Sequence, residues 1–155
     1  MPGREAVHRV PVWRSQSDFI IATSIDPADT DIVTEQLWAR RIDDRHFELC
    51  CIPFFAHDLA LGDLVQVDSA YMVEQVANPS GRYVFRAFFD SLMLRTQEKV
   101  VQGLSTLGAL LEWSSQSLVA IDARDFEHAK ELAEYLAQCE SRGLLLYETG
   151  KSRTV

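Results

Sequence analysis

The residues that most often bind metals or attack substrates are scattered along this sequence. His8, His46, His57 and His128 stand far apart, and no CxxC, HExxH or HxxxH motif is present. His46 and Cys50 share one face of a predicted strand, but four extended residues separate them by about 13 Å, too far to hold one ion. No serine or cysteine lies in a nucleophile motif such as GxSxG. The sequence therefore predicts a protein that is not an enzyme and that uses neither a metal nor another cofactor.

Carboxylates are the chemically active groups that this sequence supplies in excess. Its 155 residues include 23 Asp and Glu against 15 Lys and Arg, which gives a formal net charge of −8. The segments 26–48 and 122–148 each hold seven acidic and three basic residues. The candidates for contact with a basic partner are Asp26, Asp29, Asp31, Asp43, Asp44, Glu127, Glu131 and Glu134.

The three glutamates of this set recur at the spacing of one helix face. Glu127, Glu131 and Glu134 stand at i, i+4 and i+7, opposite the apolar stripe that we predict for the same helix. A solvated helix face is the ordinary interpretation, and a docking surface for a basic protein is the functional one. Complementary charge would raise the rate and selectivity of association more than the affinity.

Charge and hydropathy exclude several classes of function. An acidic protein is poorly suited to binding nucleic-acid phosphates. RNA-recognition domains stack bases on aromatic residues of their first and third strands, and here the third predicted strand, residues 117–122, has none. No apolar run approaches the roughly 20 residues of a membrane span, the N-terminus lacks a secretory signal, and three cysteines make no disulfide framework. We expect a cytoplasmic protein that binds neither nucleic acid nor membrane.

The first half of the chain reads as a series of short strands. β-rich runs alternate with turn residues, and Asp43-Asp44-Arg45 marks a tight hairpin. Closely spaced short strands are typical of a small, strongly bent barrel. We therefore predict an N-terminal extension over residues 1–17 and a small β-barrel-like domain over residues 18–77. The strands are expected at residues 18–25, 32–42, 46–52, 64–67 and 71–76.

The cluster Asn78-Pro79-Ser80-Gly81 marks a domain boundary, and the pattern changes after it. The order becomes strand, helix, strand, strand, helix, strand, which is the ferredoxin-like split βαβ arrangement of an α+β protein. We assign it to residues 82–149, with a tail at 150–155. Thr96 is the expected N-cap of the first helix and Asp125 that of the second. The inner stripe of the second helix is predicted to be Phe126, Ala129, Ala133 and Leu136.

One strand of this second domain is apolar on both sides. Tyr83, Phe85 and Phe89 point one way, and Val84 and Phe88 point the other. Two helices can cover only one face of the sheet, so the other face needs a second cover. The N-terminal barrel, a second copy of the chain in a homodimer, or a partner protein could supply it. We expect the barrel, because domains are built from packed layers.

Three short motifs carry a resemblance to a known family. They are Leu37-Trp38-Ala39, Ile52-Pro53-Phe54-Phe55-Ala56 and Leu59-Ala60-Leu61-Gly62-Asp63, followed by Val65 and Val67. With this spacing the chain resembles a bacterial family known as domain of unknown function family 4265, over roughly residues 18–149. The resemblance implies no activity, cofactor or substrate.

The motif residues allow two interpretations. In the first they are architectural: Trp38 anchors the core, Gly62 supplies an unusual backbone angle, and Asp63 closes a turn. In the second, Trp38, Phe55, His57 and Asp63 line a pocket between the barrel and the second sheet.

The leading functional hypothesis is a non-enzymatic acidic binding protein. We expect an immunity protein that neutralises a bacterial toxin by occluding its active or binding surface, because a small acidic protein complements a basic toxin domain. The alternative is a small-molecule-sensing or regulatory module with a pocket between its two halves. An enzyme without a recognisable motif is a third possibility.

Overall fold

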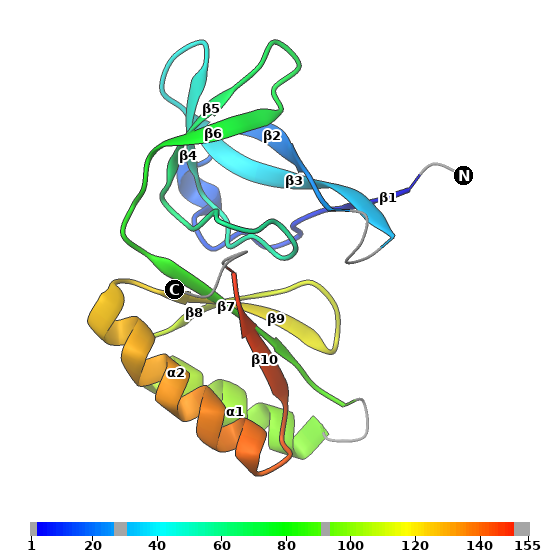
Figure 1. The fold of residues 1–155 in the computed structure, drawn as a ribbon, viewed down its shortest axis with the longest axis vertical. Helices are drawn as coiled ribbons and strands as arrows, with labels where there is room; N and C mark the ends of the chain where they lie inside the picture. Colours follow the sequence, from blue (N-terminus) through cyan, green and yellow to red (C-terminus); the bar gives the residue numbers. More distant parts are fainter. Residues whose placement is uncertain (1–2, 27–30, 91–93, 151–155) are drawn as a thin grey trace.

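The computed structural model describes residues 3–26, 31–90 and 94–150. These residues form a mixed α+β protein with two sheets and two helices (Figure 1). The N-terminal half holds β1 (Arg4–Ala6), the short 3-10 helix η1 (Arg14–Gln16), β2 (Phe19–Ser24), β3 (Ile32–Arg41), β4 (His46–Leu49), β5 (Leu64–Val67) and β6 (Val73–Asn78). The C-terminal half holds β7 (Tyr83–Phe88), α1 (Leu94–Thr106), β8 (Leu110–Trp113), β9 (Leu118–Ala123), α2 (Phe126–Ser141) and β10 (Leu146–Thr149). None of the helices described is long and apolar enough to cross a membrane.

The N-terminal sheet is built around the long strand β3. Its strands follow the order β1-β3-β4-β5-β6, and β2 pairs with β3 along the other edge. The predicted hairpin is confirmed, because β3 and β4 pair antiparallel across a turn in which Asp43 accepts backbone N–H bonds from Arg45 and His46. Alternate residues of these strands point inward and form a core that includes Leu37, Phe47 and Val65.

The prediction of a barrel is wrong, because this sheet is open. Among the described residues, β2 and β6 are joined by an isolated bridge between Ala22 and Met72 and not by a ladder. Closure needs several consecutive extended residues, and Tyr71, with a φ of 61°, interrupts the chain just before β6. The turn that Asp68 forms with the N–H groups of Ala70 and Met72 fixes this interruption.

Within the segment predicted to be an N-terminal extension, residues 4–6 contribute a strand to the N-terminal sheet. β1 pairs parallel with β3, and Glu5 accepts hydrogen bonds from Thr34 and Gln36 on that strand. The chain then passes beneath the sheet, where the backbone N–H of Trp13 donates to the carbonyl of Cys50. Val12 and Trp13 pack against the buried cluster that joins the halves, so this part of the N-terminal segment lies between them.

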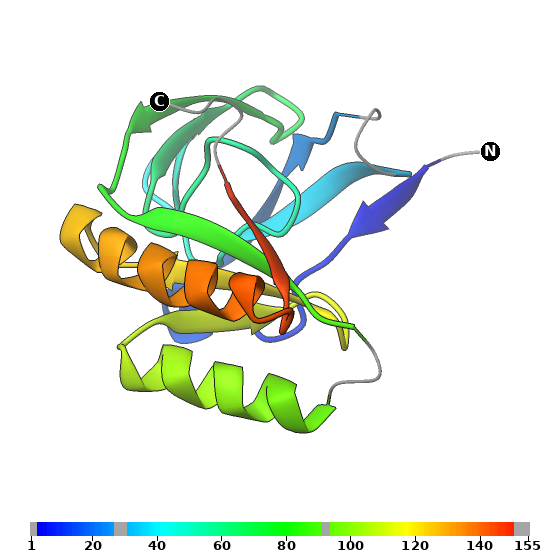
Figure 2. The same ribbon diagram turned by 60° about the horizontal axis from the view of Figure 1, so that its bottom comes forward.

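The C-terminal sheet is antiparallel, with the order β10-β7-β9-β8. Both helices lie on one face of it, on the side turned away from the N-terminal half (Figure 2). The predicted N-cap of α2 is confirmed, since the side chain of Asp125 accepts from the backbone N–H of His128 at 2.8 Å. Helix α1 begins at Leu94, earlier than the N-cap predicted at Thr96.

The inner stripe of α2 differs from the prediction at Phe126. This residue follows the N-cap directly and is 58% exposed, and its ring lies beside the Lys130 ammonium and beside Tyr83 at the start of β7. Helical spacing from the cap turns a different set of positions inward. The buried residues are His128, Ala129, Leu132, Leu136 and Cys139.

The N-terminal half covers the second face of the C-terminal sheet, as predicted. Ile52, Phe54 and Leu61 of the connection between β4 and β5 pack against Val84 of β7 and Ala120 of β9. We call this buried contact, between residues 8–13 and 50–61 on one side and β7–β9 on the other, the seam. The seam is therefore a third buried cluster, between the core of each half.

Candidate ligand-binding site

The seam contains buried charged groups as well as apolar ones. The C-terminal sheet contributes Arg86, Glu112 and Asp122, which are 2%, 3% and 1% exposed. The N-terminal half contributes His8 and Glu35, which are also buried. Buried charges are costly unless they are paired or hydrogen-bonded, so their partners define what this site can do.

The sequence held a signal for the charges of the C-terminal sheet that we did not use. Successive residues of a strand point to opposite faces, so positions two apart share a face. On the face turned toward the seam, the sequence pattern was interpreted from Val84 and Phe88 of the first strand alone. Each charged residue stands two positions after an apolar residue of this face, namely Val84, Leu110 and Ala120.

His8 connects the two halves through a pair of carboxylates. Its Nε2 lies 2.7 Å from an oxygen of Glu35 on β3, and its Nδ1 lies 2.8 Å from an oxygen of Glu112 on β8. All three side chains are at most 1% exposed. A neutral imidazole carries one N–H, whereas both ring nitrogens here face carboxylate oxygens. His8 is therefore an imidazolium that donates to both.

The directions in which the pKa values of His8 and Glu35 shift agree with this assignment. Burial by itself lowers the pKa of His8, but contacts with Cys51, Glu112 and Glu35 outweigh burial, so the pKa of His8 lies well above its ordinary value. Burial by itself raises the pKa of Glu35. The pKa of Glu35 nevertheless lies below its ordinary value, because Glu35 accepts hydrogen bonds from His8 and from backbone N–H groups and lies beside the positive charge of His8.

The same cluster fixes the conformation of the second family motif. Glu35 accepts backbone N–H bonds from Phe54, Phe55 and Ala56 at 2.7, 2.9 and 2.9 Å. Glu112 accepts from the N–H of Ile52. The imidazolium of His8 also stacks on the ring of Phe54, with centroids 3.9 Å apart. Residues 52–56 are therefore held in one conformation by a carboxylate from each half. We call His8, Glu35 and Glu112 the carboxylate–histidine cluster.

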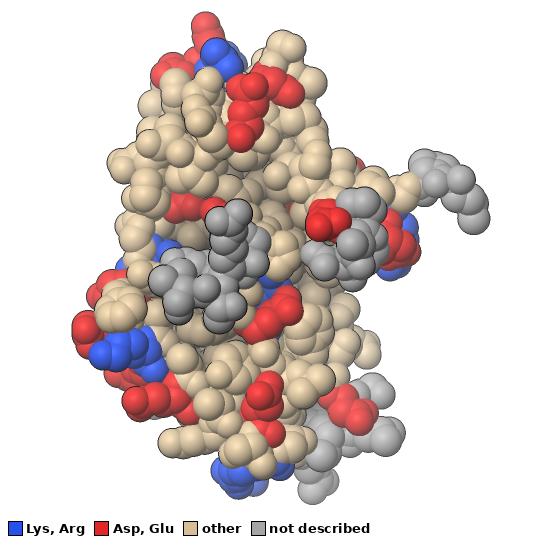
Figure 3. Space-filling view, viewed as in Figure 1, with Lys and Arg blue, Asp and Glu red and all other residues tan. Residues whose placement is uncertain are grey.

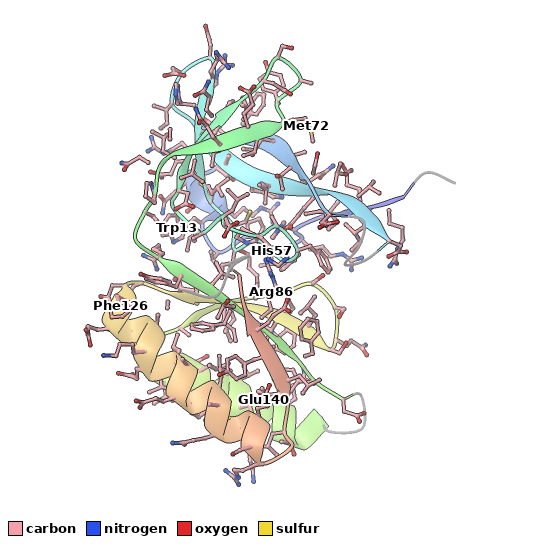
Figure 4. All side chains as sticks on the ribbon, in the orientation of Figure 1. Trp13, His57, Met72, Arg86, Phe126 and Glu140 are labelled. Carbon is pink, nitrogen blue, oxygen red and sulfur yellow. The ribbon has the colours of Figure 1, made fainter. Side chains whose placement is uncertain are left out.

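Arg86 lies beyond this motif and faces a cavity. Its guanidinium donates to the carbonyl oxygen of Ala56, and its Nη1 lies 3.6 Å from a carboxylate oxygen of Glu148 on β10. Figure 4 shows Arg86 and His57 close together where the two halves meet. The cavity measures about 380 Å³ and is lined by Ile25, Phe54, Phe55, His57, Arg86, Phe88 and Glu148.

A larger groove of about 710 Å³ lies at the other end of β7, lined in part by Asp63, Arg82 and Phe126. The guanidinium of Arg82 is already paired within the protein. It donates through two nitrogens to the two carboxylate oxygens of Asp122 and also lies over the ring of Trp13. Asp63 accepts from the backbone of Ala60 and Ser80. These contacts stabilise the fold, so we consider the smaller cavity the better candidate.

The four residues that could line a pocket separate into two places. Phe55 and His57 lie on the wall of the 380 Å³ cavity, whereas Asp63 closes the turn before β5 and lines the larger groove. Trp38 is half-buried against the N-terminal core, and its Nε1 donates to the carbonyl of His8 at 3.0 Å. Gly62 has the positive φ, 82°, that the architectural interpretation requires.

The acidic residues of the first segment are engaged locally. Asp31 pairs with Arg4, Asp43 with His46, and Asp44 with Arg41, each at 2.7 or 2.8 Å. Asp26 is exposed, and Asp29 lies outside the described residues. Figure 3 shows acidic side chains spread over the face in view and interspersed with basic ones.

The glutamates of the second segment lie elsewhere. Glu127, Glu131 and Glu134 are exposed on α2, which lies at the opposite end of the molecule from the turn between β3 and β4 (Figure 1). The structure therefore separates the predicted partner-binding residues into two surfaces.

The described residues include neither an activated thiol nor a group of side chains arranged to bind a metal ion. Cys50, Cys51 and Cys139 are free and buried, and burial raises the pKa of Cys50 to about 12 and also raises that of Cys51. No three His, Cys, Asp or Glu side chains among the described residues are grouped to hold a metal ion.

The fold and the seam define a two-sheet α+β protein with a charged interior between its halves. The family model described as Domain of unknown function (DUF4265) matches residues 35–147, so the chain belongs to this family and the resemblance of its motifs is confirmed. A solved structure described as a hypothetical protein from Neisseria gonorrhoeae is 17% identical, with a TM-score of 0.65, over 89% of this chain and 99% of that one. This likeness shows the fold. A search of curated proteins gave no match.

Proposed function

We propose that this protein is a non-enzymatic small-molecule-binding module whose ligand occupies the cavity between the two halves. The burial of Arg86 at the cavity wall is the observation that carries the proposal. A guanidinium that is 2% exposed loses most of its hydration, and a well-packed apolar residue is commonly as stable or more stable at such a position. Stability therefore does not explain why an arginine lies at this position. Binding of a ligand in the adjacent cavity does explain it.

The size and walls of the cavity support the same proposal. Small-molecule sites are mostly apolar, largely pre-formed and about 300–1,000 Å³ in volume, with a few polar groups that fix orientation. This cavity combines phenylalanine walls with Arg86, His57 and Glu148. The carboxylate–histidine cluster holds the motif that forms one of its walls. A binding role is favoured over catalysis, because the thiols of the described chain are buried and have raised pKa values.

A ligand screen with two matched variants tests this function. A molecule that binds the folded state raises the melting temperature by mass action. Phe88 lines the cavity and is 40% exposed, and Phe126 lines the larger groove and is 58% exposed, so each can be changed to alanine with little loss of core. We expect at least one metabolite to stabilise the wild type and Phe126→Ala but to stabilise Phe88→Ala less. Stabilisation that only Phe126→Ala reduces would place the ligand in the groove and contradict the proposal, as would a screen without any stabilising compound.

An immunity protein that occludes a basic toxin domain is the second candidate. The exposed stripe of Glu127, Glu131 and Glu134 on α2 supports it. With a partner co-purified from the native host, Glu131→Lys combined with Glu134→Lys should slow association and flatten its dependence on salt. Asp44→Lys, at the opposite end of the molecule, serves as the control. An association rate that only the control variant changes would remove α2 from this candidate.

Two finer assignments accompany these functions as proposals. The strand order β10-β7-β9-β8 with both helices on one face supports a ferredoxin-like C-terminal half. Free cysteines, which disulfide-forming compartments tend to oxidise, support a cytoplasmic location.

A further inference from the structure

We infer that the ligand of this cavity is a small carboxylate with an apolar body, and that its carboxylate binds Arg86 in place of Glu148. This inference rests on the proposed function and names the class of molecule that the site would take.

The charge at the cavity wall points to an anion. Arg86 is buried within the fold, while the side chain of Glu148, one of the groups that it contacts, is 52% exposed. The 3.6 Å between Nη1 and Oε1 exceeds the 2.7–3.2 Å of a normal N–H···O hydrogen bond. Glu148 is therefore a loosely held counterion at the mouth of the cavity. A ligand carboxylate can make shorter bonds to the planar guanidinium, and Glu148 can turn to water at little cost.

The remaining walls point to an apolar body. Ile25, Phe55 and Phe88 supply aliphatic and aromatic surface beside the guanidinium. The rings of Phe54 and Phe55 meet edge to face, with centroids 6.5 Å apart, an arrangement that a further ring can extend. A compact carboxylate with a flat or branched hydrocarbon group fits this combination of surfaces.

A cation or a highly charged anion fits less well. A cation would lie against the buried charge of Arg86, which repels it in a region of low dielectric constant. A phosphate carries up to two negative charges, and it would lie close to the carboxylate of Glu148. The one guanidinium of Arg86 cannot neutralise all of these charges. A ligand with one carboxylate carries the same charge as Glu148 and can take its place beside the Arg86 guanidinium.

Three compounds of nearly equal shape test the inference. Phenylacetate carries the carboxylate, phenylacetamide replaces it by a neutral amide, and phenethylamine replaces it by a cation. Titration calorimetry on the wild-type protein should show phenylacetate binding at least about tenfold more tightly than phenylacetamide, the difference expected of charge-assisted hydrogen bonds. Phenethylamine should bind more weakly than both.

Two variants place the carboxylate at Arg86. Arg86→Gln should reduce the affinity for phenylacetate about tenfold or more and leave that for phenylacetamide nearly unchanged. Because removing a buried charge can unfold the protein, Glu148→Gln provides the second test at a half-exposed position. It should increase the affinity for phenylacetate several-fold by removing the competing counterion. A decreased affinity in Glu148→Gln would overturn the inference.

The outcomes separate this inference from the proposed function. If neutral or cationic compounds bind as tightly as phenylacetate, and Phe88→Ala weakens them, the cavity is a ligand site but the carboxylate assignment is wrong. If no compound of the set or of the wider screen binds, both the inference and the proposed function fail.

Discussion

At the scale of the residue, His8 makes contacts to both halves of the molecule at once. It stands between two buried carboxylates, one on β3 and one on β8, and its ring stacks on Phe54. Each carboxylate in turn accepts backbone N–H bonds from residues 52–56. The positive charge of one imidazolium thus permits two negative charges to be buried close together.

Replacing His8 with glutamine should be strongly destabilising. The substitution keeps a hydrogen-bonding side chain but leaves Glu35 and Glu112 buried without a positive partner, a loss of about 3–5 kcal/mol in the free energy of unfolding. Urea denaturation of His8→Gln measures it. His46→Gln is the matched control, because His46 pairs with Asp43 at the surface and its loss should change stability little. Equal effects of the two substitutions would contradict the role of the cluster.

The cluster also predicts how stability depends on pH. The pKa of His8 is raised in the folded chain, so its contribution is complete below its unfolded value of 6.5 and is lost as pH rises through the folded value. The pKa of Glu35 is lowered, so its contribution is present above its unfolded value of 4.5 and is lost as pH falls.

Denaturation at a series of pH values checks this dependence. The difference in unfolding free energy between the wild type and His8→Gln should be largest between the unfolded pKa values of 4.5 and 6.5 and should shrink on the alkaline side. A difference that stays constant as pH rises would show that His8 is not charged in the folded protein.

Sequence reasoning could not have found the cluster from local pattern. His8, Glu35 and Glu112 lie on three separate segments, and each looks like an ordinary polar residue among its neighbours. Only the packing of the two sheets brings them together. The sequence could predict Phe55 and His57 as cavity residues, because Phe55 belongs to the second family motif and His57 follows it directly.

At the scale of the element, prediction succeeded where local chemistry decides the outcome. The turn at residues 43–45 and the N-cap at Asp125 depend on side chains that bond their own backbone neighbours, and both formed as expected. β1 has only three residues and is a strand because it pairs with β3, so its local sequence could not predict it. The prediction of a barrel was wrong because closure requires pairing between strands that are distant in the sequence, which local patterns do not show.

Gly62 offers a prediction at this scale, with Gly81 as its control. Both glycines have a positive φ, of 82° and 85°, so alanine at either position costs about 1–2 kcal/mol in backbone strain. At Gly62 the added Cβ would also lie 3.2 Å from the Cβ of Ser80 and 3.4 Å from the ring of Trp13, whereas at Gly81 it meets nothing within 4 Å. Chemical denaturation should therefore show Gly62→Ala less stable than Gly81→Ala. The reverse order would mean that the turn before β5 is loosely packed.

At the scale of the whole molecule, the buried seam predicts that the two halves unfold together. The connection between β4 and β5 packs on β7 and β9, and hydrogen bonds from the carboxylate–histidine cluster cross the same interface. Neither half can separate without exposing charged and apolar groups that were buried against the other.

Two optical signals from one variant measure this coupling. In Trp113→Phe the remaining indoles, Trp13 and Trp38, belong to the N-terminal half, while far-ultraviolet circular dichroism is dominated by α1 and α2 of the C-terminal half. The two signals should give the same unfolding midpoint in urea. Separate midpoints would show that the halves are independent domains.

The separation of His8 and Glu112 by 104 positions has a consequence for the order in which the chain is made. During translation all six strands of the first sheet are synthesised before Glu112. Until then residues 52–61 have no second sheet to cover their apolar side chains, and His8 faces only one of its two acidic partners. The nascent first half is thus a natural client for chaperones, and productive folding must wait for β8 to emerge.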